Sequence, residues 1–129
     1  MTALVRPRVL LADDHPAILA ALERLLEPEC EVVGAVGDGA AALEAATRLH
    51  PDVVVVDLNM PGITGLEVCG QITLSHPEVR VILLSAGDDT AIRDRSLALG
   101  ASAMIAKHQV VTLLMPAIHH ALRVSSTDS

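Results

Sequence analysis

Residues 53–62 read Val-Val-Val-Val-Asp-Leu-Asn-Met-Pro-Gly, so four valines lead directly into Asp57 and Pro61-Gly62 then interrupts the chain. A continuous run of β-branched residues predicts a strand that is buried on both faces, as the strands of a parallel sheet are. A carboxylate at the end of such a strand costs free energy unless something there uses its charge. The Pro-Gly pair predicts a turn directly afterwards. The stretch therefore predicts a buried parallel strand with a functional aspartate at its carboxyl end.

Short apolar strands of this kind alternate with helical stretches along the chain. Strands are predicted over residues 8–12, 31–36, 52–56, 79–84 and 102–106. Helices are predicted over residues 16–27, over 40–49 with Asp38 as N-cap, over 63–75, from an N-cap at Asp88 to Gly100, and over 109–123. Such βα units predict an α/β fold, a flavodoxin-like doubly wound sheet of five parallel strands in the order 2-1-3-4-5 with five helices. We expect one domain over residues 1–123, followed by a polar tail or the start of a linker over residues 124–129.

The composition argues against several classes of partner. The chain has 129 residues, 51% of them apolar, and no Phe, Tyr or Trp, so its core must be aliphatic. Its formal net charge is -7 and its nine Lys and Arg stand singly, which argues against binding of nucleic acid or an anionic membrane by this domain itself. No apolar run reaches the length of a membrane span, and no signal peptide is recognisable. Cys30 and Cys69 show no CxxC spacing, so we expect reduced cysteines in a cytoplasmic protein.

Polar side chains follow all but one of the predicted strands. They are Asp13 and Asp14 after the first strand, Asp57 and Asn59 after the third, Ser85 after the fourth and Lys107 after the fifth. The carboxyl ends of parallel strands share one edge of the sheet, so we expect these side chains to gather in one cleft. Crowded carboxylates need a cation, and oxygen donors with neither Cys nor His among them favour Mg²⁺ over Zn²⁺. Together with the lysine and the hydroxyl they form a set suited to phosphoryl transfer.

Four motifs in chain order carry a resemblance to a known family. They are Leu-Ala-Asp13-Asp14-His-Pro, Asp57-Leu-Asn-Met-Pro-Gly, Leu-Leu-Ser85-Ala86 and Ile-Ala-Lys107. Together they resemble the receiver domain of two-component response regulators over about residues 8–123. The Asp-Asp-His-Pro opening is similar to the NarL/FixJ subfamily, whose receivers drive LuxR-type DNA-binding output domains. The resemblance implies a phosphorylation-dependent signalling switch, and no enzymatic activity beyond slow self-dephosphorylation.

The resemblance also implies roles for the acidic residues. Asp57 would accept a phosphoryl group from a phosphohistidine and become an acyl phosphate. Asp14, Asp57 and the backbone carbonyl of Asn59 would hold Mg²⁺, with Asp13 assisting through water. The turn at Pro61-Gly62 would return the chain into the third helix.

Lys107 and Ser85 would respond to the phosphoryl group, according to the same resemblance. Lys107 would pair first with Asp57 and then with the phosphoryl oxygens, while Ser85 would turn toward the phosphate beside the Ala86 N–H. Receivers commonly carry Tyr or Phe as a second switch residue on the last strand, and here that position is Met104, which can repack without a ring. Receivers also often have Pro after the lysine, whereas His108 stands here, so we expect no cis peptide at that bond.

The partners implied by the resemblance are a sensor histidine kinase or phosphotransfer protein, docking near Ile18 and the loop after the fifth strand. Homodimer formation on phosphorylation is a further expectation. The chain ends where a LuxR-type regulator would begin its linker, so we expect an excised receiver in preference to a single-domain regulator. DNA binding would then belong to a missing C-terminal domain.

Other interpretations stay open at this point. A degenerate receiver would act as a docking module without phosphorylation. This alternative stays open because Met104 stands where receivers commonly have the aromatic switch residue. Gly37-Asp-Gly39-Ala-Ala-Ala42 fits a dinucleotide-binding pattern, although it follows the second strand and is also explained by an Asp N-cap with turn glycines. A Mg²⁺-dependent aspartyl phosphatase of the haloacid-dehalogenase group needs an acid–base Asp where this chain has Asn59.

Overall fold

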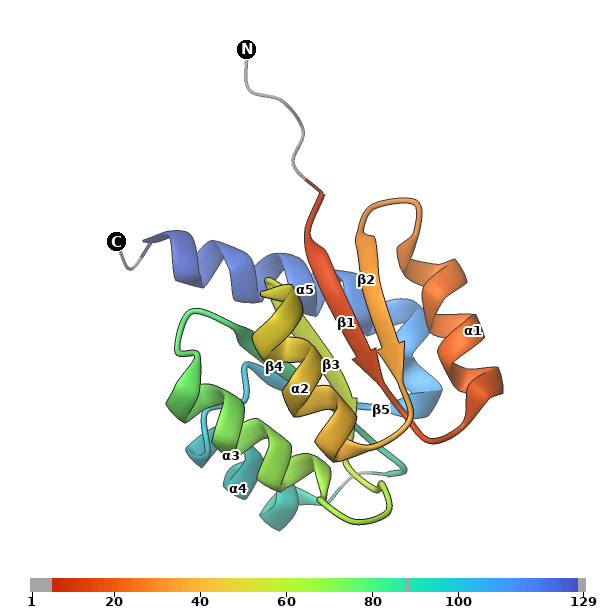
Figure 1. Cartoon of the computed structure of the whole chain (residues 1–129). Helices are drawn as coiled ribbons and strands as arrows, with labels where there is room; N and C mark the ends of the chain where they lie inside the picture. The colour runs from red at the N-terminus through yellow and green to blue at the C-terminus, as the bar shows by residue number, and fades with distance from the viewer. Residues whose placement is uncertain (1–5, 88, 128–129) are drawn as a thin grey trace.

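The chain folds around a parallel sheet of five strands in the order β2-β1-β3-β4-β5 (Figure 1). The computed structural model describes residues 6–87 and 89–127. The strands are β1 (Arg8–Ala12), β2 (Glu31–Val36), β3 (Val53–Asp57), β4 (Arg80–Ser85) and β5 (Ala103–Ala106). Every neighbouring pair is parallel. Strand order and direction confirm the doubly wound, flavodoxin-like fold predicted from the sequence.

Helices cover both faces of this sheet. One face carries α1 (Pro16–Leu26) and α5 (Val110–Thr127), and the other carries α2 (Gly39–Leu49), α3 (Gly65–Ser75) and α4 (Thr90–Ala98) (Figure 1). A short 3-10 helix, η1 (Lys107–Gln109), links β5 to α5. Because a helix returns the chain across a face between consecutive strands, all strands run in one direction and their carboxyl ends meet at one edge.

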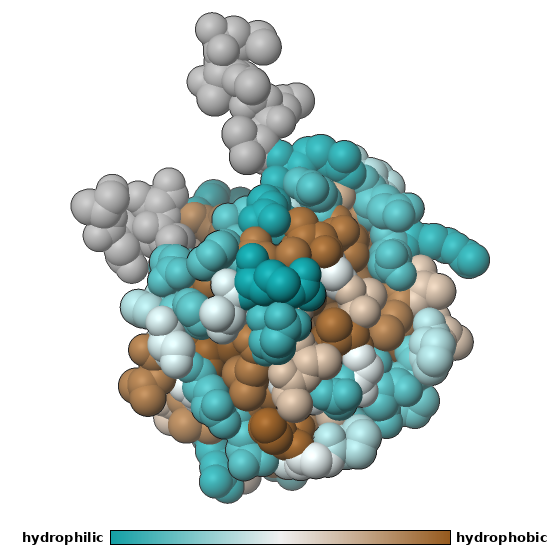
Figure 2. Space-filling model, viewed as in Figure 1, coloured by the Kyte–Doolittle hydropathy of each residue, from teal (hydrophilic) through white to brown (hydrophobic). Residues whose placement is uncertain are grey.

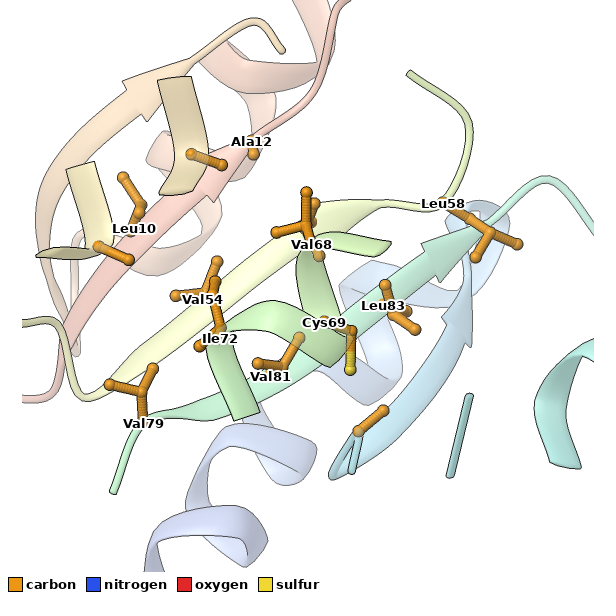
Figure 3. Packing of buried hydrophobic residues seen from close by; sticks show 14 of the residues in the cluster. Leu10, Ala12, Val54, Leu58, Val68, Cys69, Ile72, Val79, Val81 and Leu83 are labelled. Carbon is orange, nitrogen blue, oxygen red and sulfur yellow. The ribbon is translucent and has the colours of Figure 1, made fainter. Parts of the chain in front are cut away.

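The core consists of two aliphatic layers, one on each side of the sheet. The valines of β3 alternate between them: Val54 and Val56 belong to the layer under α2 and α3, and Val53 and Val55 to the layer under α1 and α5. Figure 3 shows the first layer, where side chains of α3 point onto the valines and leucines of β3 and β4. All four valines are at most 1% exposed, so the prediction of a strand buried on both faces is confirmed.

The end of β3 and the start of α3 differ from the predicted boundaries. β3 includes Asp57 as its last residue, so the carboxylate belongs to the strand itself. The turn that follows contains Gly62 at a φ of 76°, a conformation that suits glycine. α3 begins at Gly65, because Thr64 forms a capping box with Glu67: the Thr64 hydroxyl accepts from the Glu67 N–H, and the Glu67 carboxylate accepts from the Thr64 N–H. This Thr64-x-x-Glu67 pattern is a local signal for a helix that starts two residues after the predicted boundary.

The last two helices also differ in their boundaries. Asp89 caps α4 by accepting from the Ile92 N–H, in place of Asp88, which lies outside the described residues. Gly100 follows this helix with a φ of 106°, as expected for a helix-ending glycine. α5 continues to Thr127, beyond the predicted end at residue 123, and residues 128–129 lie outside the described part.

The outer surface of the α2–α3 side mixes polar and apolar patches (Figure 2). The exposed apolar side chains of the described residues include Leu74 of α3 and Val111 of α5, at 86% and 78%. Exposed apolar side chains are ordinary on a folded domain. Among the described residues, no helix combines the length and apolar character needed to cross a membrane.

Gly65 is predicted to be essential for the close approach of α3 to β3. A Cβ at this position would lie 2.4 Å from the Asp57 carbonyl oxygen and 2.7 Å from the Leu58 Cα, both of them backbone atoms that cannot easily move. We expect Gly65→Ala to lower the free energy of unfolding by about 1–3 kcal/mol. The matched control is Gly70→Ala in the same helix, where the nearest atom would be 3.8 Å away and helix propensity predicts a gain of about 0.5–1 kcal/mol. Urea denaturation measures both, and equal effects of the two substitutions would contradict the packing argument.

Candidate functional site

The candidate side chains lie at the carboxyl ends of four strands, β1, β3, β4 and β5, and therefore at one edge of the sheet. Asp13 directly follows β1, and its N–H donates to the Val36 carbonyl at the end of β2. Asp57 and Ser85 are the last residues of β3 and β4, and Lys107 directly follows β5. Because β1 and β3 are neighbours and β4 and β5 continue the sheet, this register carries all of these residues to the same edge.

Lys107 makes the central contacts of this edge. Its Nζ lies 3.1 Å from Asp57 Oδ2 and 3.3 Å from Asp13 Oδ2, so one ammonium faces two carboxylates. The side chains of Asp13 and Asp57 are 0% and 1% exposed, whereas that of Lys107 is 25% exposed. The two negative charges are therefore withdrawn from water and share a single positive charge.

Two buried oxygen atoms of this cluster have Lys107 as their contact. Apart from their contacts of 3.3 and 3.1 Å with the Lys107 ammonium, Asp13 Oδ2 and Asp57 Oδ2 have no hydrogen-bond partner. Buried acceptors of this kind are costly unless a further group approaches them. Ligand atoms of Asp13, Asp14, His15 and Asp57 lie within 4.8 Å of one another, close enough to share one ion. The donor set therefore fits a divalent cation.

The pKa values of Asp57 and Lys107 are shifted by burial and by their mutual attraction. Burial raises the pKa of the Asp57 carboxyl above its ordinary value, and the Asp13 charge adds to this, while the Asn59 N–H and the Lys107 ammonium offset part of the rise. Burial acts to lower the pKa of Lys107, but the attraction of Asp57 and Asp13 outweighs it and the pKa is raised. Lys107 therefore stays protonated, and its positive charge stabilises the ionised form of Asp57, which burial alone would disfavour.

His15 lies in this cluster, whereas the sequence predicted a site without histidine. Its Nδ1 is 3.0 Å from Asp13 Oδ1 and 3.1 Å from Asp14 Oδ1, and its backbone N–H donates to Asp13 Oδ1 at 2.9 Å. The side chains of His15 and Asp14 are 61% and 33% exposed, so this side of the cluster opens to solvent. One sequence signal could have predicted this position: His15 stands between Asp14 and Pro16, the first residue of α1, so the chain must stay near the end of the strand there.

The remaining candidates surround a neighbouring pocket of about 220 Å³, which Asn59, Ser85 and Met104 help to line. The Asn59 N–H donates to Asp57 Oδ1 at 3.2 Å. The Ser85 hydroxyl donates to the Gly87 carbonyl at 2.7 Å and is therefore turned along its own loop. Met104 is 3% exposed, with its Sδ 3.7 Å from the Ser96 hydroxyl, so its side chain points inward. As expected, the peptide bond between Lys107 and His108 is trans.

The loop that fits a dinucleotide-binding pattern is accounted for by packing. The Asp38 carboxylate accepts from the Ala41 N–H and caps α2, as predicted from the sequence. A Cβ at Gly39 would lie 2.6 Å from the Ile63 carbonyl oxygen, so a glycine is needed for the contact with the turn before α3. Both the aspartate and this glycine therefore have structural roles that do not involve a cofactor.

Comparisons with known proteins point to one family. The family model described as the response regulator receiver domain matches residues 9–119. The transcriptional regulatory protein DegU of Brevibacillus brevis is 34% identical over 113 residues, which are 86% of this chain and 48% of DegU. The nitrate/nitrite response regulator protein NarP of Escherichia coli is 32% identical over 124 residues, which are 95% of this chain and 58% of NarP.

The solved structures give the same result. The signal receiver domain of the response regulator NarL from Mycobacterium tuberculosis is 33% identical to this chain and has a TM-score of 0.80, with 88% of this chain and 97% of that one covered. The chain spans about half the length of the curated relatives it matches.

The buried charge of Asp57 predicts that its removal stabilises the metal-free fold. A raised pKa means that the ionised form is disfavoured in the folded state, a cost present above the folded pKa and absent below the ordinary value of about 3.9. We expect Asp57→Asn to raise the free energy of unfolding at pH 7 without divalent cations by about 1–2 kcal/mol, and the gain to shrink as the pH falls toward 4. Urea denaturation in a chelating buffer measures this, with Asp94→Asn on the exposed side of α4 as the control for net charge. A loss of stability in Asp57→Asn would contradict the assignment of the cost to burial.

Proposed function

The chain belongs to the family of response regulator receiver domains, the signalling domains of two-component systems, and on this premise we propose that Asp57 is its phosphoacceptor. One observation carries the proposal: Asp57 is buried at the end of β3, and its Oδ2 lies 3.1 Å from the Lys107 ammonium without another hydrogen-bond partner. A carboxylate held in this way is fixed in orientation and next to a positive charge. Both properties favour attack on a phosphoryl group.

The transfer itself requires little covalent chemistry from the protein. A carboxylate oxygen of Asp57 forms a bond to phosphorus while the P–N bond of a donor phosphohistidine breaks, and the leaving imidazole keeps the electron pair and takes up a proton. Lys107 stabilises the charge that collects on the phosphoryl oxygens, since its ammonium already faces Asp57. The product is an acyl phosphate on Asp57.

The metal in this proposal is Mg²⁺. Asp14, Asp57 and the Asn59 carbonyl would hold it, with Asp13 assisting through water. Support comes from the compact set of carboxylate oxygens and from the two buried oxygen atoms without a hydrogen-bond partner apart from Lys107. When bound, the ion neutralises part of the negative charge that gathers between the carboxylates and the phosphoryl group.

Phosphorylation would change the contacts of Lys107, Ser85 and Met104. The Ser85 hydroxyl would leave the Gly87 carbonyl and donate to the phosphate beside the Ala86 N–H. Space for this movement exists in the 220 Å³ pocket that Ser85, Ala86 and Met104 line. The Met104 side chain would then move into the space that Ser85 leaves. These movements would shift an equilibrium between two surface conformations.

The phosphorylated state would persist, because Asn59 cannot act as a general acid or base for hydrolysis. Receiver domains of this family are signalling domains and not enzymes in general. For this chain we propose at most a slow self-dephosphorylation.

The proposed donor is a sensor histidine kinase or a phosphotransfer protein. An apolar groove of about 290 Å³ lies between α1 and α5, and its lining includes Ile18, Val110 and Lys107. A donor seated there would reach the edge that carries Asp57. DegU is named as a transcriptional regulatory protein, and DegU and NarP are each about twice as long as this chain. We propose that output runs through a DNA-binding domain outside this chain, with homodimer formation on phosphorylation. Two buried cysteines without a disulfide fit the cytoplasm as the compartment.

Intact mass after incubation with acetyl phosphate tests the acceptor. We expect the wild-type protein to gain one phosphoryl group with Mg²⁺ and none with a chelator, and Asp57→Asn to gain none under either condition. Asp94→Asn, which removes an exposed carboxylate, should behave as the wild type. A folded wild-type protein that gains nothing would instead favour a docking module that works without phosphorylation.

The role of Met104 as a switch residue is tested by its methyl resonance. In protein labelled at the methionine methyl groups, we expect beryllofluoride with Mg²⁺ to shift the Met104 signal, because its side chain lines the pocket beside Ser85. Met115 on α5, whose Sδ contacts Cys30, is the internal control. Ser85→Ala should retain acetyl phosphate labelling and reduce the Met104 shift. Equal responses of Met104 and Met115 would show that Met104 is ordinary core.

A further inference from the structure

A further polar pocket lies at the opposite edge of the sheet from Asp57. It has a volume of about 130 Å³ and is lined by Arg80, Ser102, His120 and Ala121. Arg80 is the first residue of β4, Ser102 directly precedes β5, and His120 belongs to α5. The C-terminal half of α5 lies at the end of the sheet where the strands begin, so these side chains meet far from the proposed phosphoacceptor (Figure 1).

The guanidinium of Arg80 is the central group of this pocket. Its Nε is buried and has no hydrogen-bond partner, and within residues 6–87 and 89–127 the side chain forms no ion pair either. The neighbouring carboxylates make their contacts elsewhere: that of Asp52 accepts from the Arg8 N–H, and that of Glu78 lies 4.0 Å from His76 Nδ1. Buried donors in folded proteins nearly always have an acceptor, so we expect a group from outside the chain to supply one here.

The other polar side chains of the pocket can donate hydrogen bonds as well. In the described part of the chain, the Ser102 hydroxyl and the His120 ring have no hydrogen-bond partner, whereas the neighbouring His119 lies 3.2 Å from Glu29. No Asp or Glu among the described residues lines the pocket. A guanidinium, a hydroxyl and an imidazole are all donors, and the arginine fork matches the paired oxygens of carboxylate and phosphate groups. The lining therefore suits a small oxyanion and not a cation.

The volume of the pocket, about 130 Å³, suits a ligand of this class. Since a water molecule takes up about 30 Å³ in the liquid, this volume holds roughly four waters or one group of about four or five non-hydrogen atoms. We propose that the pocket binds a phosphate or carboxylate group through the Arg80 guanidinium, with the Ser102 hydroxyl and the His120 ring as further donors. The site is separate from that of the proposed function and does not depend on it.

Titration with two anions, followed by nuclear magnetic resonance, tests the proposal. In a chelating buffer at constant pH, with the ionic strength kept constant by chloride, we expect inorganic phosphate or acetate to shift the His120 imidazole signals saturably. The signals of His50, at the end of α2, should stay unchanged. Arg80→Gln, which removes the charge, should weaken binding about tenfold or more. The matched control is Arg24→Gln, which removes an exposed charge in the last turn of α1 and should bind as the wild type does.

The two anions also identify the chemistry of the ligand. Saturation with phosphate alone would indicate a phosphate group, saturation with acetate alone a carboxylate, and either result supports the proposal. No saturable shift with either anion, or equal shifts of His120 and His50, would overturn it.

Two further variants keep the test decisive if Arg80→Gln does not fold, which circular dichroism shows. Arg80→Lys retains the charge but lacks the Nε–H and the planar fork, so its affinity should stay below that of the wild type. Ser102→Ala removes one neutral donor and should weaken binding about threefold or more. Unchanged affinity in the folded variants of Arg80 and in Ser102→Ala would contradict the assignment of the site to this pocket.

Discussion

The burial of two carboxylates around one lysine is the constraint on which the rest of this structure depends. β3 is apolar on both faces and still ends in Asp57, which is 1% exposed. Lys107 directly follows β5, two strands away from β3, and it reaches Asp57 because the strands end at a common edge of the sheet. The fold, the turn after β3 and the close approach of Gly65 all serve to hold this carboxylate in place.

The sheet and most of the site could be predicted because their signals are local. Four consecutive valines, the Asp38 cap and the polar residues at the ends of four strands each reflect a short stretch of chain, and parallel topology then brings the strand ends together. The start of α3 at Gly65, two residues after the predicted start, follows from the capping box of Thr64 with Glu67, which is a local signal as well. The cap of α4 was placed one residue early, because two adjacent aspartates are equally good caps by composition.

The position of His15 could not be predicted in the same way. Whether a loop side chain points into a cleft or away from it depends on rotamer choice and on the tertiary neighbours that the loop meets. The His15 backbone donates a hydrogen bond to Asp13, and Asp13 is itself held by the β2 carbonyl and by Lys107, so the position of this loop depends on contacts that are distant in sequence. Likewise the inward position of Met104 depends on Ser96, which lies on another element.

The two oxygens of Asp13 face different partners, Oδ1 toward His15 and Oδ2 toward Lys107. Any replacement of Asp13 would therefore remove both contacts at once. The effect of a substitution at His15 or Lys107 on stability would then depend on which residue occupies position 13. We therefore expect the effects of substitutions at the three positions on stability to be non-additive.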